Sequence, residues 1–373
     1  MSSYSLATLW HERQRYLPGI LAVAFSALLI ALQCGLLLGL FSITAIPIDH
    51  THADIWMGAP EVLSVDLGRP IRESYLARLA SQPEVERCEI YLQGFAYWSK
   101  PDGGTELCMV IGSRLGDEAL GRVDELTPQM RAALTEPGTI VVDESDLRRL
   151  GIKGVGDKAE VSGHRVRVVG LTKRLPSLAG PYVFCSIETA RSRLRLLPDQ
   201  TTYVLARCHN KAEAPAVVRR LKEEHKDLSA FTSDEFSRRS QVHWLTKTKA
   251  GVALGYAAAL GLLVGAVVTS QTLYAATVAS LREYAVLRAL GIPRWRMALM
   301  VMAQSFWVGI IGVALALPAV HGLAQLAGRL GVQVLLPWWL LSGAAAVTLA
   351  TALLAGLFAL RSLRLVEPAM LLR

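Results

Sequence analysis

Few residues in this sequence have the types and the spacing that chemistry requires. The segment Gly151-Ile-Lys-Gly-Val-Gly156 is rich in glycine, but no lysine and hydroxyl residue follow its last glycine to hold phosphate and magnesium. The sequence contains neither a Gly-x-Ser-x-Gly nucleophile motif nor a His-Glu-x-x-His zinc motif, and its eight histidines are dispersed. We therefore predict that the chain catalyses no reaction and binds no metal or cofactor of its own.

The five cysteines do not form a recognisable redox or metal motif. Cys34 lies in an apolar run, where a small apolar residue is the simplest interpretation. Cys88, Cys108, Cys185 and Cys208 lie in the long central segment, and no pair has Cys-x-x-Cys spacing. An oxidising compartment permits disulfides, so two bridges and four free thiols are both open interpretations.

The apolar residues are concentrated in four runs that lack fully charged side chains. Each run exceeds the roughly 20 residues that a helix needs to cross a bilayer core. The first run is too long for the core of a cleaved signal peptide and has no clear cleavage site, so we expect a retained helix. Within it, Gly35 and Gly39 predict a face on which another helix approaches closely. The predicted membrane helices are 17–46, 246–280, 297–325 and 335–360.

The distribution of charge predicts the orientation of these helices. The net charge is +8, but the stretch 47–249 has nearly equal numbers of basic and acidic residues, which argues against nucleic acid as a partner. The excess of arginine flanks the helices, and short basic segments stay in the cytoplasm. We therefore place the N-terminal segment 1–16, the loop 281–296 and the tail 361–373 inside. The domain 47–245 and the loop 326–334 then lie outside.

The two edges of the outer domain have the same pattern of elements. Alternating apolar residues and turn signals predict strand, helix and strand at each edge, and hence one α+β lobe formed by 47–100 and 201–245. The middle, 101–200, has short alternating segments and predicts an inserted β-rich lobe. The predicted elements are the strands Glu61–Asp66, Val85–Trp98, Thr202–Cys208 and Leu228–Phe231 and the helices Ile71–Ser81 and Ala212–Lys226.

These elements define the predicted fold class. It is a membrane α-helical protein with four transmembrane helices and an α+β two-lobed extracytoplasmic domain inserted between helices 1 and 2. The interiors of the predicted membrane helices carry no charged residue, unlike those of most ion-coupled transporters. If the protein moves a substrate, another subunit must supply the energy.

The cytoplasmic loop 281–296 is the most informative segment. Glu283 in its first turn and Arg288 near its last suit a helix dipole, and Gly291 followed by Pro293 is a stop signal. Val286, Leu287 and Leu290 give this short helix an apolar side. Two interpretations are open on these grounds alone: the helix docks in a groove of a partner protein, or it lies on lipid.

This segment resembles the cytoplasmic coupling helix of the FtsX/MacB-type mechanotransmission permeases of ABC transporters. The family pattern R-E-x-A-[VIL]-L-[RK]-A-[LI]-G is matched at Arg282, Glu283, Ala285, Val286, Leu287, Arg288, Ala289, Leu290 and Gly291. The end of the chain, Pro368-Ala-Met-Leu-Leu-Arg373, is similar to the family's tail. The start of the outer domain, Ala53-Asp-Ile-Trp56, looks most like the DevC and haemin-exporter branches.

The resemblance implies a partnership. Such permeases work as dimers, and a separate ABC ATPase carries the ATP and magnesium and pushes on the coupling helix. Export through a periplasmic adaptor and an outer-membrane channel is one implied function, and FtsX-like regulation of a cell-wall enzyme without transport is the alternative. The implied location is the bacterial inner membrane, in contact with its lipid. The implied ATPase-coupling residues are Arg282, Glu283, Val286, Leu287, Arg288, Leu290 and Gly291.

Overall fold

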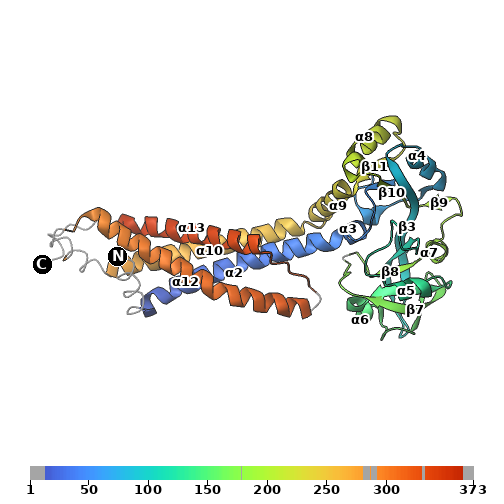
Figure 1. Ribbon diagram of the computed structural model, residues 1–373. Helices are drawn as coiled ribbons and strands as arrows, with labels where there is room; N and C mark the ends of the chain where they lie inside the picture. The colour runs from blue at the N-terminus through green and yellow to red at the C-terminus, as the bar shows by residue number, and fades with distance from the viewer. Residues whose placement is uncertain (1–12, 178, 280–285, 287–291, 330–331, 364–373) are drawn as a thin grey trace. The chain divides into compact units, whose positions relative to one another are not determined.

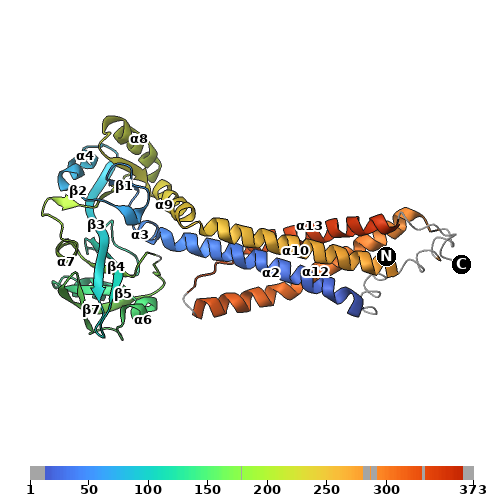
Figure 2. The same cartoon turned by 180° about the vertical axis from the view of Figure 1, so that it is seen from behind.

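The computed structural model describes residues 13–177, 179–279, 286, 292–329 and 332–363. The chain divides into two compact units. One unit comprises Met1–Gly39 and Ala250–Arg373 and is referred to below as the membrane unit. The other, Leu40–Lys249, is the α/β domain (Figures 1 and 2).

Four long helices make up most of the described part of the membrane unit, and each is long and apolar enough to cross a membrane. The runs without charged residues explain these helices. Such runs are stable in lipid, where a helix pairs all the backbone N–H and C=O groups within the segment. Pro18 lies near the start of the first helix and Pro318 lies inside the third. The helices are α2 (Arg13–Thr44), α10 (Ala250–Ala279), α12 (Arg294–Arg329) and α13 (Trp338–Leu363).

Small residues bring α2 and α10 into close contact. A Cβ atom added at Gly265 would lie 2.4 Å from Ser26 Cβ, and one added at Gly261 would lie 2.7 Å from Leu29 Cδ1. The Ser26 hydroxyl donates to the Gly261 carbonyl at 3.2 Å. These glycines are therefore required by the separation of the two helices, as is common in membranes.

Gly35 and Gly39 have a different role from the predicted one. They do not receive another helix, so that prediction is wrong. Instead they face the non-helical segment 332–337 that precedes α13: a Cβ on Gly39 would lie 2.0 Å from the Gln333 carbonyl oxygen, and Leu335 N–H donates to the Gly35 carbonyl at 3.0 Å. The two glycines leave a strip of the α2 backbone without side chains. The non-helical segment lies against this strip and so obtains a hydrogen-bond acceptor for one of its backbone N–H groups.

One lobe of the α/β domain has a β-α-β-β-α-β topology. Its four strands pair in the order β11-β1-β10-β3, and all neighbours are antiparallel. This is the split βαβ arrangement of ferredoxin-like folds. Helix α4 packs on β3, and α8 packs on β11 through an apolar face. The elements are β1 (Ile55–Gly58), α4 (Leu76–Ala80), β3 (Val85–Ser99), β10 (Tyr203–Cys208), α8 (Ala214–Glu224) and β11 (Ser229–Thr232).

The second lobe is a closed six-stranded barrel inserted between β3 and β10. Its strands follow the order β3-β4-β8-β5-β7-β6, and β6 pairs back with β3. β3 serves both lobes, because residues up to Tyr91 pair with β10 and residues from Leu92 pair with β4. Trp98, Cys108 and Cys185 belong to the buried cluster of this lobe. The strands are β4 (Thr105–Ser113), β5 (Thr139–Asp143), β6 (Lys158–Val161), β7 (His164–Thr172) and β8 (Tyr182–Ser186).

Short elements complete the domain. Helix α9 follows β11 and leads along the chain to α10, and the backbone of Lys249 between them has a φ of 52°. The remaining elements are α3 (Ile46–Asp49), α5 (Pro128–Ala133), α6 (Leu147–Leu150), α7 (Ile187–Arg193), α9 (Ser233–Thr248), the pair β2 (Ile71–Arg72) and β9 (Gln200–Thr201), and the 3₁₀ turns η1 (Val65–Leu67), η2 (Glu73–Tyr75), η3 (Glu144–Asp146) and η4 (Lys211–Glu213).

Two predicted elements of this domain are wrong or too long. No strand forms over Glu61–Asp66, which ends in η1. The strand of this region is β1, earlier in the chain. The predicted helix Ile71–Ser81 is α-helical only over α4, because its first two residues pair with β9 and the next three form η2.

Candidate coupling site

A buried apolar cluster joins all four helices of the membrane unit, and it is referred to below as the anchor cluster. Large and small side chains from different helices fill it, so a displacement of one helix at this point must displace the others, since packed interiors have little free volume. Its members are Tyr16, Ile20 and Val23 of α2, Leu273 of α10, Met297, Val301 and Val308 of α12, and Ala352 and Ala355 of α13.

The helices on both sides of the segment between α10 and α12 contribute to the anchor cluster. On the α10 side, Leu273 is fully buried and accepts a hydrogen bond from the hydroxyl of Thr277 at 2.7 Å. On the α12 side, Ile292 packs against the cluster and Met297 lies in it. Arg296 N–H donates to the Pro293 carbonyl at 3.0 Å and so closes the first turn of α12. Force on this segment would therefore reach all four helices.

Among the predicted coupling residues, Val286 lies within the described part of the chain. It is helical, and 49% of its surface is exposed. Arg282, Glu283, Leu287, Arg288, Leu290 and Gly291 lie outside the described residues. The predicted segment also includes Trp295, which is 59% exposed and has the Arg296 guanidinium 5.3 Å from its ring centroid. An exposed indole beside a cation at the start of a span is typical of a membrane interface.

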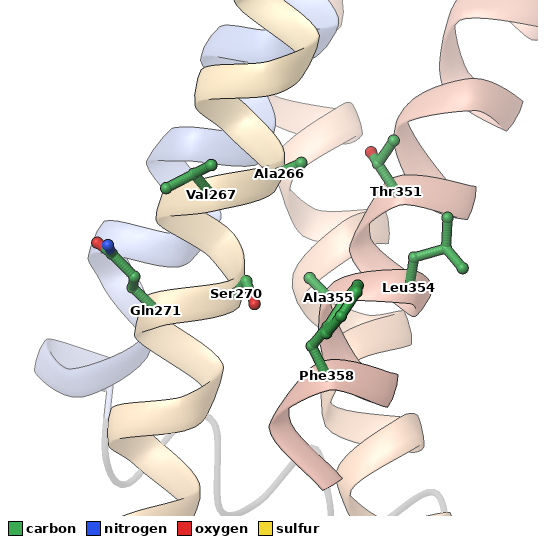
Figure 3. Close-up of a pocket in the computed structure, with 8 residues that line it drawn as sticks. All are labelled: Ala266, Val267, Ser270, Gln271, Thr351, Leu354, Ala355 and Phe358. Atoms are coloured by element: carbon green, nitrogen blue, oxygen red, sulfur yellow. The ribbon is translucent and has the colours of Figure 1, made fainter. Parts of the chain in front are cut away.

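A shallow groove of about 390 Å³ lies between α10 and α13. Figure 3 shows Ser270 of α10 facing α13, with Thr351, Leu354 and Phe358 on the opposite helix, whereas Gln271 points away from α13. The lining is mainly apolar, and no titratable residue lines it. The groove therefore offers contact surface and no acid–base chemistry.

Two backbone donors of the glycine-rich loop 151–156 are bound by a carboxylate of the same chain. Lys153 N–H and Gly154 N–H both donate to Asp157 Oδ2, at 2.7 and 3.3 Å. A carboxylate of the same chain thus holds the position that an anion would take. Gly151 ends α6 in the left-handed conformation, which is the ordinary use of a glycine there.

Metal-ligating side chains occur in the α/β domain only as pairs, and no group of three or more forms among the described residues. His50 Nδ1 lies 2.7 Å from Glu125 Oε1, and His52 Nε2 lies 3.0 Å from Asp124 Oδ1. All five cysteines, which lie within the described ranges, are free. Burial raises the pKa of the Cys108 thiol to about 12, so it is an apolar core residue and no nucleophile.

The sequence does not reveal that Asp66 is buried. The sequence pattern predicts a strand at Asp66, but the residue lies in the turn η1, and its carboxyl is buried against α9. No local motif signals this, because the partners come from distant parts of the chain. Arg191 has a structural role, because its guanidinium donates to the Leu197 and Gln200 carbonyls and to Glu73.

These features define a class of protein: a multi-pass membrane protein with an α/β domain between its first and second helices. The FtsX-like permease C-terminal model matches residues 255–368, and the MacB-like periplasmic core domain model matches residues 20–224, more than half of the chain. The chain therefore belongs to the FtsX/MacB-type family of ABC transporter permeases. The predicted family and fold class are confirmed, including the extracytoplasmic placement of the α/β domain.

Part of the chain is similar to solved structures. The periplasmic region of MacB from Actinobacillus actinomycetemcomitans is 13% identical, with a TM-score of 0.36, and the match covers 51% of this chain and 94% of that one. The extracellular domain of the noncanonic ABC-type transporter YknZ from Gram-positive bacteria is 10% identical, with a TM-score of 0.33, and the match covers 48% and 98%. No curated protein sequence matches the chain.

Proposed function

We propose that this protein is the membrane subunit of a bacterial ABC transporter in which a separate ATPase docks on the segment 281–296. The observation that carries the proposal is the pair of family matches, because this family generally works with an ABC ATPase. The subunit resides in the inner membrane with both termini in the cytoplasm, and two copies form the working permease. ATP and magnesium belong to the ATPase, and this chain is non-catalytic.

The anchor cluster supports a mechanical route for the energy. Docking force on the segment 281–296 acts on α10 and α12, and through the cluster on α2 and α13. α2 leads covalently into the extracytoplasmic domain, and α10 follows it. Movement of these two helices is therefore transmitted mechanically to the domain, and no substrate or ion needs to pass between the helices.

The movements of the domain serve export or efflux, in which a periplasmic adaptor and an outer-membrane channel take part. Purification of the tagged full chain from native membranes in mild detergent tests this. We expect a stoichiometric ATPase among the bound proteins, together with an adaptor or channel. A cell-wall hydrolase in place of the adaptor would instead establish the FtsX-like regulatory function.

The docking site is tested by charge reversal at the predicted segment. Glu283→Arg should abolish ATPase association and the response of ATP hydrolysis to this subunit, because it reverses a charge in the docking helix. Glu86→Arg is the matched control, since Glu86 is an exposed acid on β3 of the extracytoplasmic domain. Association that survives Glu283→Arg, or is lost equally in Glu86→Arg, would remove the docking assignment.

A further inference from the structure

Asp66 is a buried acid without a cationic partner. Only 5% of its surface is exposed, and it makes none of the ion pairs found among the described residues. Its partners are neutral: Trp244 Nε1–H donates to Asp66 Oδ2 at 2.9 Å, and Gln93 Nε2 lies 3.5 Å from Oδ1. A buried carboxylate that is neither paired with a cation nor hydrated is costly in its charged form.

The acid lies where the 62–67 loop meets α9. Three side chains of α9 bind this loop: Arg239 Nε–H donates to the Val62 carbonyl at 2.9 Å, the Ser240 hydroxyl accepts from Val65 N–H at 3.0 Å, and Trp244 donates to Asp66. Ser240 and Trp244 are four residues apart and so lie on neighbouring positions of one helix face. The loop is therefore fastened along α9 at successive turns.

The surroundings of the acid are polar enough to bind water when they open. Three buried polar atoms, on residues that contact, interact with or nearly adjoin Asp66, have no hydrogen-bond partner among the described residues: Ser64 Oγ, Tyr91 Oη and Gln93 Oε1. Unpaired groups of this kind are normally satisfied by water. Hydration of Asp66 would thus relieve several groups together.

The other titratable groups do not compensate the charge of Asp66. Tyr91 on β3, Tyr182 on β8 and Tyr203 on β10 face it, and burial raises the pKa of each phenol so that all stay neutral. On α9, the Arg239 guanidinium is bonded to the Val62 carbonyl, and the His243 ring is 6.2 Å from that of Trp244. Burial raises the pKa of Asp66 from 3.8 to about 6, and the bond from Trp244 opposes this.

We propose that Asp66 is a proton-dependent latch that fastens α9 to the 62–67 loop. Protonated Asp66 favours the closed arrangement described here. Ionised Asp66 favours an open one, in which this part of α9 has separated from the loop and the carboxylate is hydrated. The chain leaves the domain through α9 and passes through Lys249 into α10. The latch therefore acts on the helix by which the chain leaves the domain. The inference does not depend on the proposed transport function.

The sign follows from linkage. The closed state holds the proton more tightly than a hydrated carboxyl does, since its pKa is about 6 in place of 3.8. Closure is therefore fully favoured below about pH 4 and is weakened as the pH rises through 6. A difference of about two pKa units corresponds to about a hundredfold change in the ratio of open to closed molecules.

Hydrogen exchange of the full chain in lipid nanodiscs tests the latch. Asp66→Asn keeps the shape of the side chain but is always neutral, so it imitates the protonated form. The comparison of wild type with Asp66→Asn at each pH cancels the intrinsic pH dependence of exchange. In α9 we expect the ratio of the two exchange rates to rise from about two- to threefold at pH 4 to about a hundredfold at pH 7.

Asp146→Asn is the matched control. Asp146 is also buried and its pKa is also raised to about 6, by burial above all, but it lies in η3 of the barrel lobe. We expect this variant to leave exchange in α9 as in the wild type. The latch is refuted if α9 exchanges alike in wild type and Asp66→Asn at pH 7. It is equally refuted if Asp146→Asn reproduces the effect, or if all peptides of the domain respond alike.

A second variant tests the partner of the acid. Trp244→Phe removes the N–H donor, and a bond to an ionised carboxylate is stronger than one to a neutral acid. Exchange in α9 should therefore accelerate severalfold more at pH 7 than at pH 4. Equal acceleration at both pH values would show that Trp244 only packs there and does not serve the latch.

Discussion

The interiors of the two units of this protein are packed in opposite ways. In the extracytoplasmic domain, the largest side chains are fully buried, among them Trp56, Trp98 and Tyr91. In the membrane unit, the tightest contacts are made where side chains are missing. Gly261 and Gly265 of α10 admit side chains of α2 in this way, and Gly356 of α13 admits the Ser305 hydroxyl of α12.

The difference follows from the solvent of each unit. Water drives apolar side chains into the core of the domain, so large buried side chains stabilise the domain. Lipid is as apolar as leucine and gives no such force, so helices associate through close packing and through hydrogen bonds between helices, such as that of the Ser26 hydroxyl. Removal of bulk should therefore be costly in one unit, and addition of bulk in the other.

The largest expected effect is the loss of bulk from the barrel. Trp98→Ala should lower the free energy of unfolding of the domain by about 3–5 kcal/mol, because Trp98 is fully buried and its Nε1–H donates to the Leu150 carbonyl at 2.9 Å. Thermal unfolding of the full chain measures this. Tyr97→Ala is the control, since Tyr97 is the next residue on β3 and is 66% exposed. Equal losses for both variants would contradict the account.

An intermediate effect is expected from bulk added between α2 and α10. Gly265→Leu should destabilise the membrane unit by about 1–3 kcal/mol, because its side chain would enter the space of Ser26. Gly255→Leu lies on the same helix with no atom within 4 Å of an added Cβ, and should be neutral. Resistance to denaturing detergent compares the two. A stable Gly265→Leu variant would show that the helices are not in close contact.

The smallest effect is expected from the hydrogen bond at the same contact. Ser26→Ala removes the donor to the Gly261 carbonyl but keeps the packing. Hydrogen bonds between membrane helices contribute about 0.6 kcal/mol on average, so the same detergent titration should shift only slightly. A loss as large as that of Gly265→Leu would mean that hydrogen bonding, and not packing, governs this contact.

The sequence reveals the membrane unit better than the domain. Four helices are predictable because each run without charge exceeds the width of a bilayer. The role of Gly35 and Gly39 is not predictable from the sequence, because a helix face without side chains accepts another helix or an extended segment equally well. The strip receives the segment 332–337, and only the return path of the chain after α12 decides this.

In the domain, local pattern and tertiary structure diverge at particular residues. The strands at Val85–Trp98 and Thr202–Cys208 are predictable from β-rich composition, and they are close to β3 and β10. The start of the segment Glu61–Asp66 alternates as a strand does, since Val62 is buried and Leu63 exposed, whereas Val65 and Asp66 are both buried. Its backbone bonds instead to side chains of α9, about 175 residues away. Closure of the barrel by β3 and β6 is likewise a long-range pairing without a local signal.

The central claim is that the segment 281–296 is the docking site of an ATPase. A photoreactive amino acid in place of Val286, whose side chain is exposed, tests it in intact cells, and the same substitution at the exposed Val155 of the extracytoplasmic domain is the control. The account predicts a cross-link to an ABC ATPase from position 286 and none from position 155. A reactive group at 286 that captures no ATPase, or an ATPase captured from 155, would contradict it.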